Sequence, residues 1–180
     1  MIKRSNLILD CTTNKEPREG RLIQSLFDVC TLYKPVKASC LYYPVTSKEG
    51  FLSKLSTDTK YNIIHISAHG SPKGIGNGST WEAKMEEIAE KKTKNLKANL
   101  VHVSACVANR KKLADAFNSN YFIAPDTEVD WINSAMFSTL FYKRYIVDGK
   151  PLHTAFEFAR KRTQTCCDYP VYWYDERKKK

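Results

Sequence analysis

The sequence contains no long apolar run, and this absence argues against a membrane-spanning protein. None of its apolar segments approaches the roughly 18 residues that a transmembrane helix needs. The N-terminal segment MIKRSNLILDC has basic residues near its start, but the apolar run that follows them, Leu7–Leu9, spans only three residues. That length is too short for the core of a secretory signal peptide. We therefore expect a cytoplasmic protein with no membrane partner.

The sequence also lacks internal repeats and any stretch with the composition of an interdomain linker. Its 180 residues, 42% of them hydrophobic, are enough to bury one core. We expect a single domain over residues 1–180, with ERKKK at 176–180 as a solvated basic tail. The six cysteines occur without an export signal, which favours free thiols in a reducing compartment.

Acidic residues are in the minority. There are 19 of them against 29 lysines and arginines, which gives a formal net charge of +10. Such a charge is compatible with nucleic-acid binding, but the sequence carries no recognised nucleic-acid motif. It can equally steer an acidic protein partner toward the chain. A nucleotide- or nucleic-acid-binding α/β domain is therefore retained only as an alternative.

Segments with the pattern of strands alternate with segments that have helical spacing of apolar residues. This alternation predicts an α/β fold, with a mostly parallel sheet of about six strands covered by helices on both faces. The expected strands are 6–12, 36–45, 61–68, 100–105, 121–124 and 171–174, the last at an edge. The expected helices are 18–33, a short one after Ser47, 81–94, 109–117, 131–147 and 152–163.

Two of the expected strands end in residues that carry chemistry. NIIHISAHG at 62–70 ends in His69 and Gly70, and LVHVSAC at 100–106 ends in Cys106. Ligands of parallel α/β sheets bind at the carboxyl ends of the strands. Because side chains alternate along a strand, the register that pairs His69 with Cys106 also places His65 beside His102.

A cysteine beside a histidine suits nucleophilic catalysis. The imidazole takes the thiol proton, the thiolate attacks a carbonyl, and the resulting oxyanion needs backbone donors. The N–H groups of Gly70 and Cys106 are candidates for those donors. Taken singly, Cys106 is typical of a buried thiol and His69 of a turn residue. Their occurrence together at matching strand ends favours catalysis.

A metal or cofactor site is not expected. His65 and His69 lie four residues apart on one strand, about 13 Å, so they cannot share one ion. The segment GSPKGIGNGST at 70–80 contains glycines between a strand and a helix, but its spacing matches neither phosphate-binding glycine motif. We interpret it as a flexible active-site loop, with a phosphate cradle as the alternative.

HISAHG followed by VHVSAC resembles the CHAT-domain family, relatives of caspases, separases and gingipains. FIAPDTEVDWINSAMFSTLFYKRYIVDGKPLHTAFEFAR, which follows the cysteine, is similar to later elements of that family, so the resemblance covers roughly 61–163. It implies a caspase-like three-layer sandwich and a cysteine endopeptidase with His69 as base and Cys106 as nucleophile. It also implies a protein substrate, a role such as prokaryotic defence, and a separately encoded regulatory or sensor partner.

The sequence around the cysteine departs from the caspase pattern. Caspases have Gln before the Ala-Cys pair and Arg-Gly after it, whereas this chain has Ser104 before it and Val107-Ala108 after it. Cleavage after aspartate is therefore unsupported. A catalytically silent CHAT-like interaction module remains the main alternative to a protease.

Three acidic residues, Asp126, Glu128 and Asp130, follow the expected strand at 121–124. They are candidates for binding a basic substrate residue. The resemblance to separases and gingipains implies an acidic group in the pocket that receives the substrate residue before the cut. Asp130 is also a good N-cap for the helix that begins near Trp131. The sequence leaves these two roles of Asp130 open.

Overall fold

The computed structural model describes residues 5–13, 15–16, 18–33, 38–91, 97–106, 110–117, 119–125, 128–166 and 172–176. Its centre is a six-stranded sheet with the strand order β2-β1-β3-β7-β8-β9. Five neighbouring strands are parallel, and β9 pairs antiparallel with β8 at one edge. The strands are β1 (Ser5–Asp10), β2 (Cys40–Pro44), β3 (Lys60–Ser67), β7 (Lys97–Ser104), β8 (Tyr121–Pro125) and β9 (Tyr172–Glu176).

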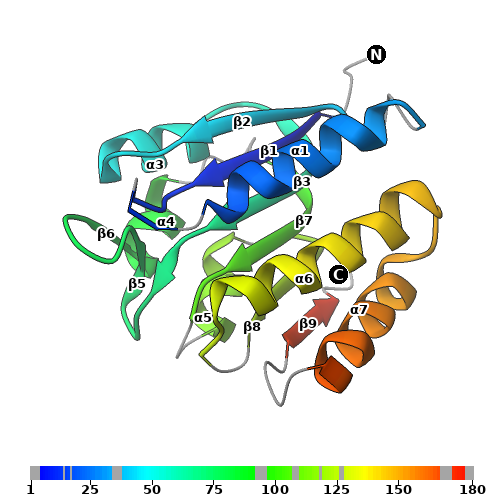
Figure 1. The fold of residues 1–180 in the computed structure, drawn as a ribbon. Coiled ribbons are helices and arrows are strands. Elements are labelled where there is room, and N and C mark those ends of the chain that lie inside the picture. Colours follow the sequence, from blue (N-terminus) through cyan, green and yellow to red (C-terminus); the bar gives the residue numbers. More distant parts are fainter. Residues whose placement is uncertain are drawn as a thin grey trace.

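Helices cover both faces of this sheet, which confirms the predicted α/β architecture (Figure 1). On the near face of Figure 1 lie α1 (Glu19–Thr31), α6 (Trp131–Tyr142) and α7 (Leu152–Cys166), with a π-helical turn, Lys143–Val147, between the last two. The far face carries α3 (Lys48–Leu55), α4 (Met85–Lys91) and α5 (Arg110–Phe117). None of the helices in the described ranges is long and apolar enough to cross a membrane.

Each face of the sheet has its own core. Toward α3, α4 and α5, the buried residues include Ile64 and Val103, packed with Phe51 and Phe117. Toward α1, α6 and α7, Ile63 and Leu100 pack with Phe27, Phe137 and Phe156. Because β3 and β7 are buried on both faces, their sequences are apolar almost throughout, as expected for central parallel strands.

The glycine-rich segment forms a small sheet where a flexible loop was expected. It consists of β4 (His69–Gly70), β5 (Gly74–Gly76) and β6 (Glu82–Lys84), paired antiparallel. A Cβ on Gly76 would lie 2.1 Å from the Trp81 carbonyl oxygen, so glycine is what lets these strands approach. The helix predicted over 81–94 accordingly begins only at Met85, because 82–84 pairs as a strand.

The register of β3 and β7 confirms the predicted pairing of His65 with His102. Both side chains are fully buried on the α1–α6 face, with their ring centroids 4.9 Å apart and the planes at 87°. The Tyr142 hydroxyl lies 2.9 Å from Nδ1 of His65 and 3.1 Å from Nδ1 of His102. Burial lowers the pKa of His65 to about 3 and that of His102 well below its usual value, so both rings are neutral.

We predict that Tyr142→Phe destabilises the protein by about 1–3 kcal/mol, because it removes the hydroxyl that serves two buried ring nitrogens. Urea unfolding at neutral pH measures the change. Tyr33→Phe is the matched control, because Tyr33 is 68% exposed and its loss should stay within about 0.5 kcal/mol. Equal stability of the two variants would contradict a structural role for the Tyr142 hydroxyl.

Candidate active site

His69 and Cys106 lie side by side at the carboxyl ends of adjacent strands. Ser67 pairs with Ser104 in the last register position, and the Ala68 N–H donates to the Ser104 carbonyl at 3.1 Å. His69 follows Ser67 by two residues, and Cys106 follows Ser104 by two residues. The geometry that the sequence predicted for these two residues, the same rim on neighbouring strands, is therefore what the structure contains.

Gly70 packs directly on the backbone of Cys106. A Cβ at Gly70 would lie 1.6 Å from the Cys106 carbonyl oxygen and 2.5 Å from its carbonyl carbon. No side chain fits at that distance, so the contact requires glycine. It fixes the His69–Gly70 strand against the residue that carries the thiol.

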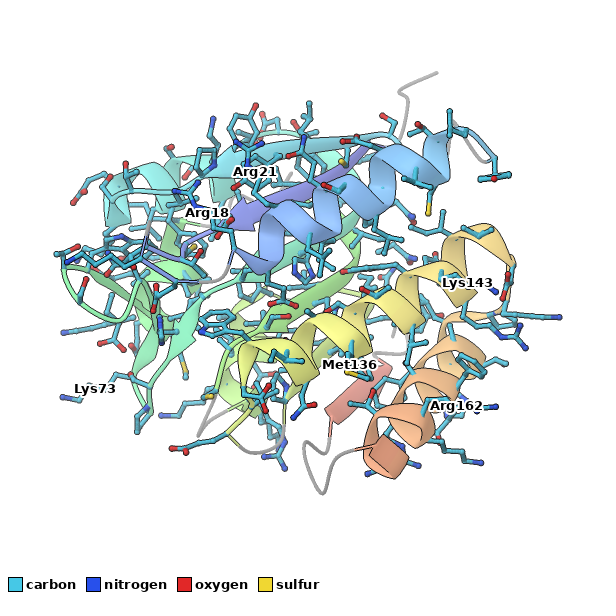
Figure 2. The ribbon with its side chains drawn as sticks, in the orientation of Figure 1. Arg18, Arg21, Lys73, Met136, Lys143 and Arg162 are labelled. Atoms are coloured by element: carbon cyan, nitrogen blue, oxygen red, sulfur yellow. The ribbon has the colours of Figure 1, made fainter. Side chains whose placement is uncertain are left out.

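His69 and Cys106 line one small cavity of about 60 Å³. Its wall is built from both strand ends and from the start of α6. The lining residues are Ala68, His69, Ser104, Ala105, Cys106, Val129, Trp131 and Ser134. A second, larger space of about 550 Å³ lies along the small sheet, and His69, Gly78 and Trp81 are among its walls. Lys73, at the outer tip of that sheet, points away from α6 (Figure 2).

Glu16 holds the ring of His69. Its Oε1 is hydrogen-bonded to Nε2 of His69, and its Oε2 accepts from the N–H and the hydroxyl of Thr13 at 2.7 and 2.8 Å. Burial acts to raise the pKa of Glu16, but the bonds from Thr13 and His69 prevail and lower it. An ionised Glu16 requires a proton on Nε2, which leaves Nδ1 as the basic nitrogen of a neutral ring. Trp131 meets the same ring edge-on, 5.4 Å between centroids.

The Cys106 sulfur is in contact with the turn that precedes α6. The Val129 N–H donates to Sγ at 3.3 Å, and the Val129 carbonyl oxygen lies 3.7 Å from the same sulfur. These two contacts fix the sulfur against the backbone of Val129. Cys106 is a free thiol, as are the other cysteines whose side chains are described, Cys11, Cys30 and Cys40.

In the turn before α6, which contains Glu128 and Asp130, successive residues point alternately to solvent and to the cavity. Val129 and Trp131 face the cavity, while Asp130 is exposed and caps α6 by accepting from the Asn133 N–H at 2.8 Å. The capping role that the sequence suggested for Asp130 is thus present. Glu128 does not line the cavity either, and Asp126 lies outside the described residues.

A buried carboxylate that the sequence analysis did not single out lies behind the cavity. Glu19, in the first turn of α1, is 3% exposed, and its Oε1 accepts from three serine hydroxyls. The donors are Ser104 at 3.0 Å, Ser134 at 3.1 Å and Ser138 at 3.0 Å. Burial raises the pKa of Glu19 to about 7, although the hydroxyls act in the opposite direction.

Within the described ranges, no group of three or more His, Cys, Asp or Glu side chains could hold a metal ion. The groups available for chemistry at the carboxyl ends of these strands are a thiol, an imidazole and backbone N–H donors. Two carboxylates accompany them, Glu16 with a lowered pKa and Glu19 with a raised pKa. Glu16 and Glu19 are the functional candidates that sequence reasoning missed. The signal that could have found them is their position after β1, the strand on the other side of β3.

Comparison with known proteins supports the fold but not an activity. No protein-family model matches the chain, and no curated protein matches it. Among solved structures, the Arg specific cysteine proteinase gingipain R is similar, with a TM-score of 0.63 and 10% sequence identity. The match covers 90% of this chain and 42% of gingipain R. The chain thus has the caspase-like fold of that proteinase and spans less than half of its length.

We predict that Gly70→Ala greatly slows the reaction of Cys106 with iodoacetamide, because the added methyl group displaces the Cys106 carbonyl. Mass spectrometry of the labelled chain gives the rate. Gly149→Ala is the control. Its φ of +66° makes alanine strained by about 1 kcal/mol, yet no atom lies within 4 Å, so Cys106 should keep its rate. Equal labelling of the two variants would contradict a tight Gly70–Cys106 contact.

Proposed function

We propose that the protein is a cysteine endopeptidase in which His69 and Cys106 form the catalytic dyad. The observation that carries the proposal is that both side chains line one cavity at neighbouring strand ends. The bond between Glu16 and Nε2 of His69 supports it, because it fixes the tautomer that a general base needs. The caspase-like fold, shared with a cysteine proteinase, supports it further.

The first half of the reaction forms a thioester. Nδ1 of His69 takes the proton of the Cys106 thiol, and the sulfur attacks the carbonyl carbon of the scissile peptide bond. The N–H groups of Gly70 and Cys106 stabilise the oxyanion. The C–N bond then breaks as His69 returns the proton to the leaving amine, and the acyl group remains on sulfur.

The second half of the reaction regenerates the enzyme. His69, again neutral, takes a proton from a water molecule that attacks the thioester carbonyl. Collapse of this intermediate breaks the C–S bond and releases the carboxylic acid product, and His69 returns its proton to the sulfur to restore the thiol. Glu16 stabilises the imidazolium formed in each half, since its carboxylate accepts the Nε2 proton throughout.

The family, substrate and regulator of this proposed protease are inferred from the sequence resemblance. HISAHG and VHVSAC resemble the CHAT-domain proteases, and from this resemblance we propose a protein substrate, a role such as prokaryotic defence and a separately encoded regulator. The candidates for binding a basic residue before the cut are Asp126, Glu128 and Asp130. Gingipain R is Arg specific by name, and we propose the same class of substrate residue here.

A catalytically silent interaction module is the second candidate. The observation that favours it is the small size of the cavity above Cys106, about 60 Å³, with the Val129 backbone against the sulfur. A silent module would have a thiol that stays unreactive toward peptidyl electrophiles. The reactivity of Cys106 therefore separates the two candidates.

We predict that a peptidyl acyloxymethyl ketone modifies the wild-type chain at Cys106, as located by mass spectrometry. Cys106→Ala should abolish labelling and lower kcat/KM for peptide cleavage by at least about a thousandfold. His69→Ala should also lower both strongly, because it removes the base. Cleavage that survives in Cys106→Ala would refute the dyad.

Cys40→Ala is the matched control for this experiment. Burial, with a smaller contribution from the Asp28 charge, raises the pKa of Cys40 to about 11, so its thiolate is scarce at neutral pH. The variant should label and cleave at the wild-type rates. Circular dichroism of each variant checks that it keeps its secondary structure.

A further inference from the structure

A groove of about 570 Å³ runs between α1 and α6 at the surface of the protein. Most of the side chains that line it are apolar, and they include Leu22 from α1 and Ile132, Ala135, Met136 and Leu140 from α6. The four α6 residues recur at helical spacing, so they form one stripe along that helix. Met136 lies midway along it (Figure 2). We call this feature the α1–α6 groove.

The apolar walls of the α1–α6 groove are open to solvent. Leu22 is 50% exposed and Ile132 is 73% exposed. Among the exposed large hydrophobic residues of the described ranges, all except Leu41 belong to α1, to the two residues that follow it, or to α6. An apolar surface gathered on one pair of helices is typical of a binding surface.

Both ends of the groove are positively charged. Arg18 lines its start and, within the described part of the chain, has no carboxylate at ion-pair distance. Lys143 lies at the opposite end (Figure 2) and continues the α6 stripe three residues after Leu140. Lys143 pairs with Asp148 at 3.0 Å, but Arg144 binds the same carboxylate at 2.8 Å, so this end keeps a net positive charge.

Acidic side chains do not cancel this charge. Among the described residues, Glu19 is the one acidic side chain that lines the groove, and it is buried. Burial raises the pKa of Glu19 to about 7, so it carries only part of a negative charge at neutral pH. The α1–α6 groove is therefore apolar along its middle and positive at its ends.

We propose that the α1–α6 groove docks an amphipathic α-helix of a partner protein, with an apolar stripe on one face and carboxylates near both ends. The side-chain ridge of a helix packs into a groove of this kind, with apolar residues three and four positions apart as anchors. The α6 wall from Trp131 to Leu140 is roughly 14 Å long at 1.5 Å per residue, so a helix of about three turns fills it.

Two other occupants suit this surface less well. A second copy of the chain brings a net charge of +10 against +10, which opposes association, whereas the same charge attracts an acidic partner. A lipid bilayer offers a flat surface and would leave a concave groove unfilled. The combination of concave shape, apolar walls and positive ends therefore favours an acidic helix.

The groove adjoins the candidate active site through Trp131. This side chain lines both the groove and the cavity that contains Cys106, and its ring meets that of His69 edge-on. A docked helix therefore contacts a residue that touches the proposed base. The inference itself does not rest on the proposed function, because binding is measured without any cleavage.

The test begins with a display library of random peptides of about 16 residues, enough for about four helical turns, that lack tryptophan. The library is selected on the immobilised wild-type chain. Enriched peptides should carry a net negative charge and apolar residues at helical spacing. A selection that enriches basic or non-periodic sequences, or that enriches nothing, overturns the proposal.

Fluorescence anisotropy with a synthetic copy of the most enriched peptide then locates the binding surface. Ile132→Asp should raise Kd at least about tenfold, because it removes an apolar contact and adds a charge of the same sign as the peptide. Leu41→Asp is the matched control, since Leu41 is 44% exposed but lies on β2, outside the groove, and Kd should stay at the wild-type value. Equal affinity of the two variants overturns the proposal.

A pair of charge reversals separates the groove from the charge of the whole chain. Arg18→Glu should raise Kd about three- to tenfold. Lys73→Glu changes the net charge equally, but Lys73 points away from α6 (Figure 2), and at about 0.15 M salt the Debye length is about 8 Å. Its Kd should therefore stay unchanged. Equal weakening by both variants would show attraction by overall charge alone and would overturn the proposal.

Tryptophan emission of the wild-type chain gives an answer that needs no groove variant. A helix in the groove removes water from the Trp131 indole, so the emission should shift to shorter wavelength when the peptide binds. Binding with no shift overturns the proposal. So does a wild-type dimer that Ile132→Asp makes monomeric in sedimentation, or binding to phosphatidylserine vesicles that the same variant abolishes.

Discussion

The parallel register of β3 and β7 is the constraint on which the site depends. It sets Ser67 opposite Ser104 and thereby brings His69 level with Cys106. A slip of one residue would turn one of the two side chains to the opposite face of the sheet. Two contacts hold the register: the His65–His102–Tyr142 cluster along the strands and the Gly70 backbone against Cys106 at their ends. The same strand register therefore positions both the polar cluster in the core and the candidate site.

Much of this alignment can be predicted from sequence, because it depends on properties of single strands. A strand buried on both faces is apolar almost throughout, so 61–68 and 100–105 are recognisable. Alternation then assigns His65, His69, His102 and Cys106 to one face, and the carboxyl-end rule assigns the last residues to the rim. The capping role of Asp130, one of the two roles that the sequence leaves open, is also accessible from sequence, because capping depends only on the residues that follow the cap.

The remaining parts depend on which elements become neighbours, and no local pattern specifies that. Glu19 in the first turn of a helix is typical of a residue that complements the helix dipole, and nothing nearby in sequence reveals the serines of β7 and α6 around it. Glu16 is separated from His69 by 53 positions. The small sheet was missed for the same reason, because the pairing of β5 with β6 joins a glycine-rich stretch to residues that also suit a helix.

The two glutamates that follow β1 show how burial assigns different tasks to the same side chain. Glu16, near the surface, receives hydrogen bonds from Thr13 and His69 and has a lowered pKa, so it remains a permanent anion that orients an imidazole. Glu19, only three positions later, lies inside the protein, and desolvation outweighs its serine donors and raises its pKa. One carboxylate therefore stays charged at any pH near neutrality, while the other gains its charge there. The imidazole that Glu16 orients therefore keeps the same tautomer across neutral pH, whereas the serines of β7 and α6 surround a group whose charge changes there.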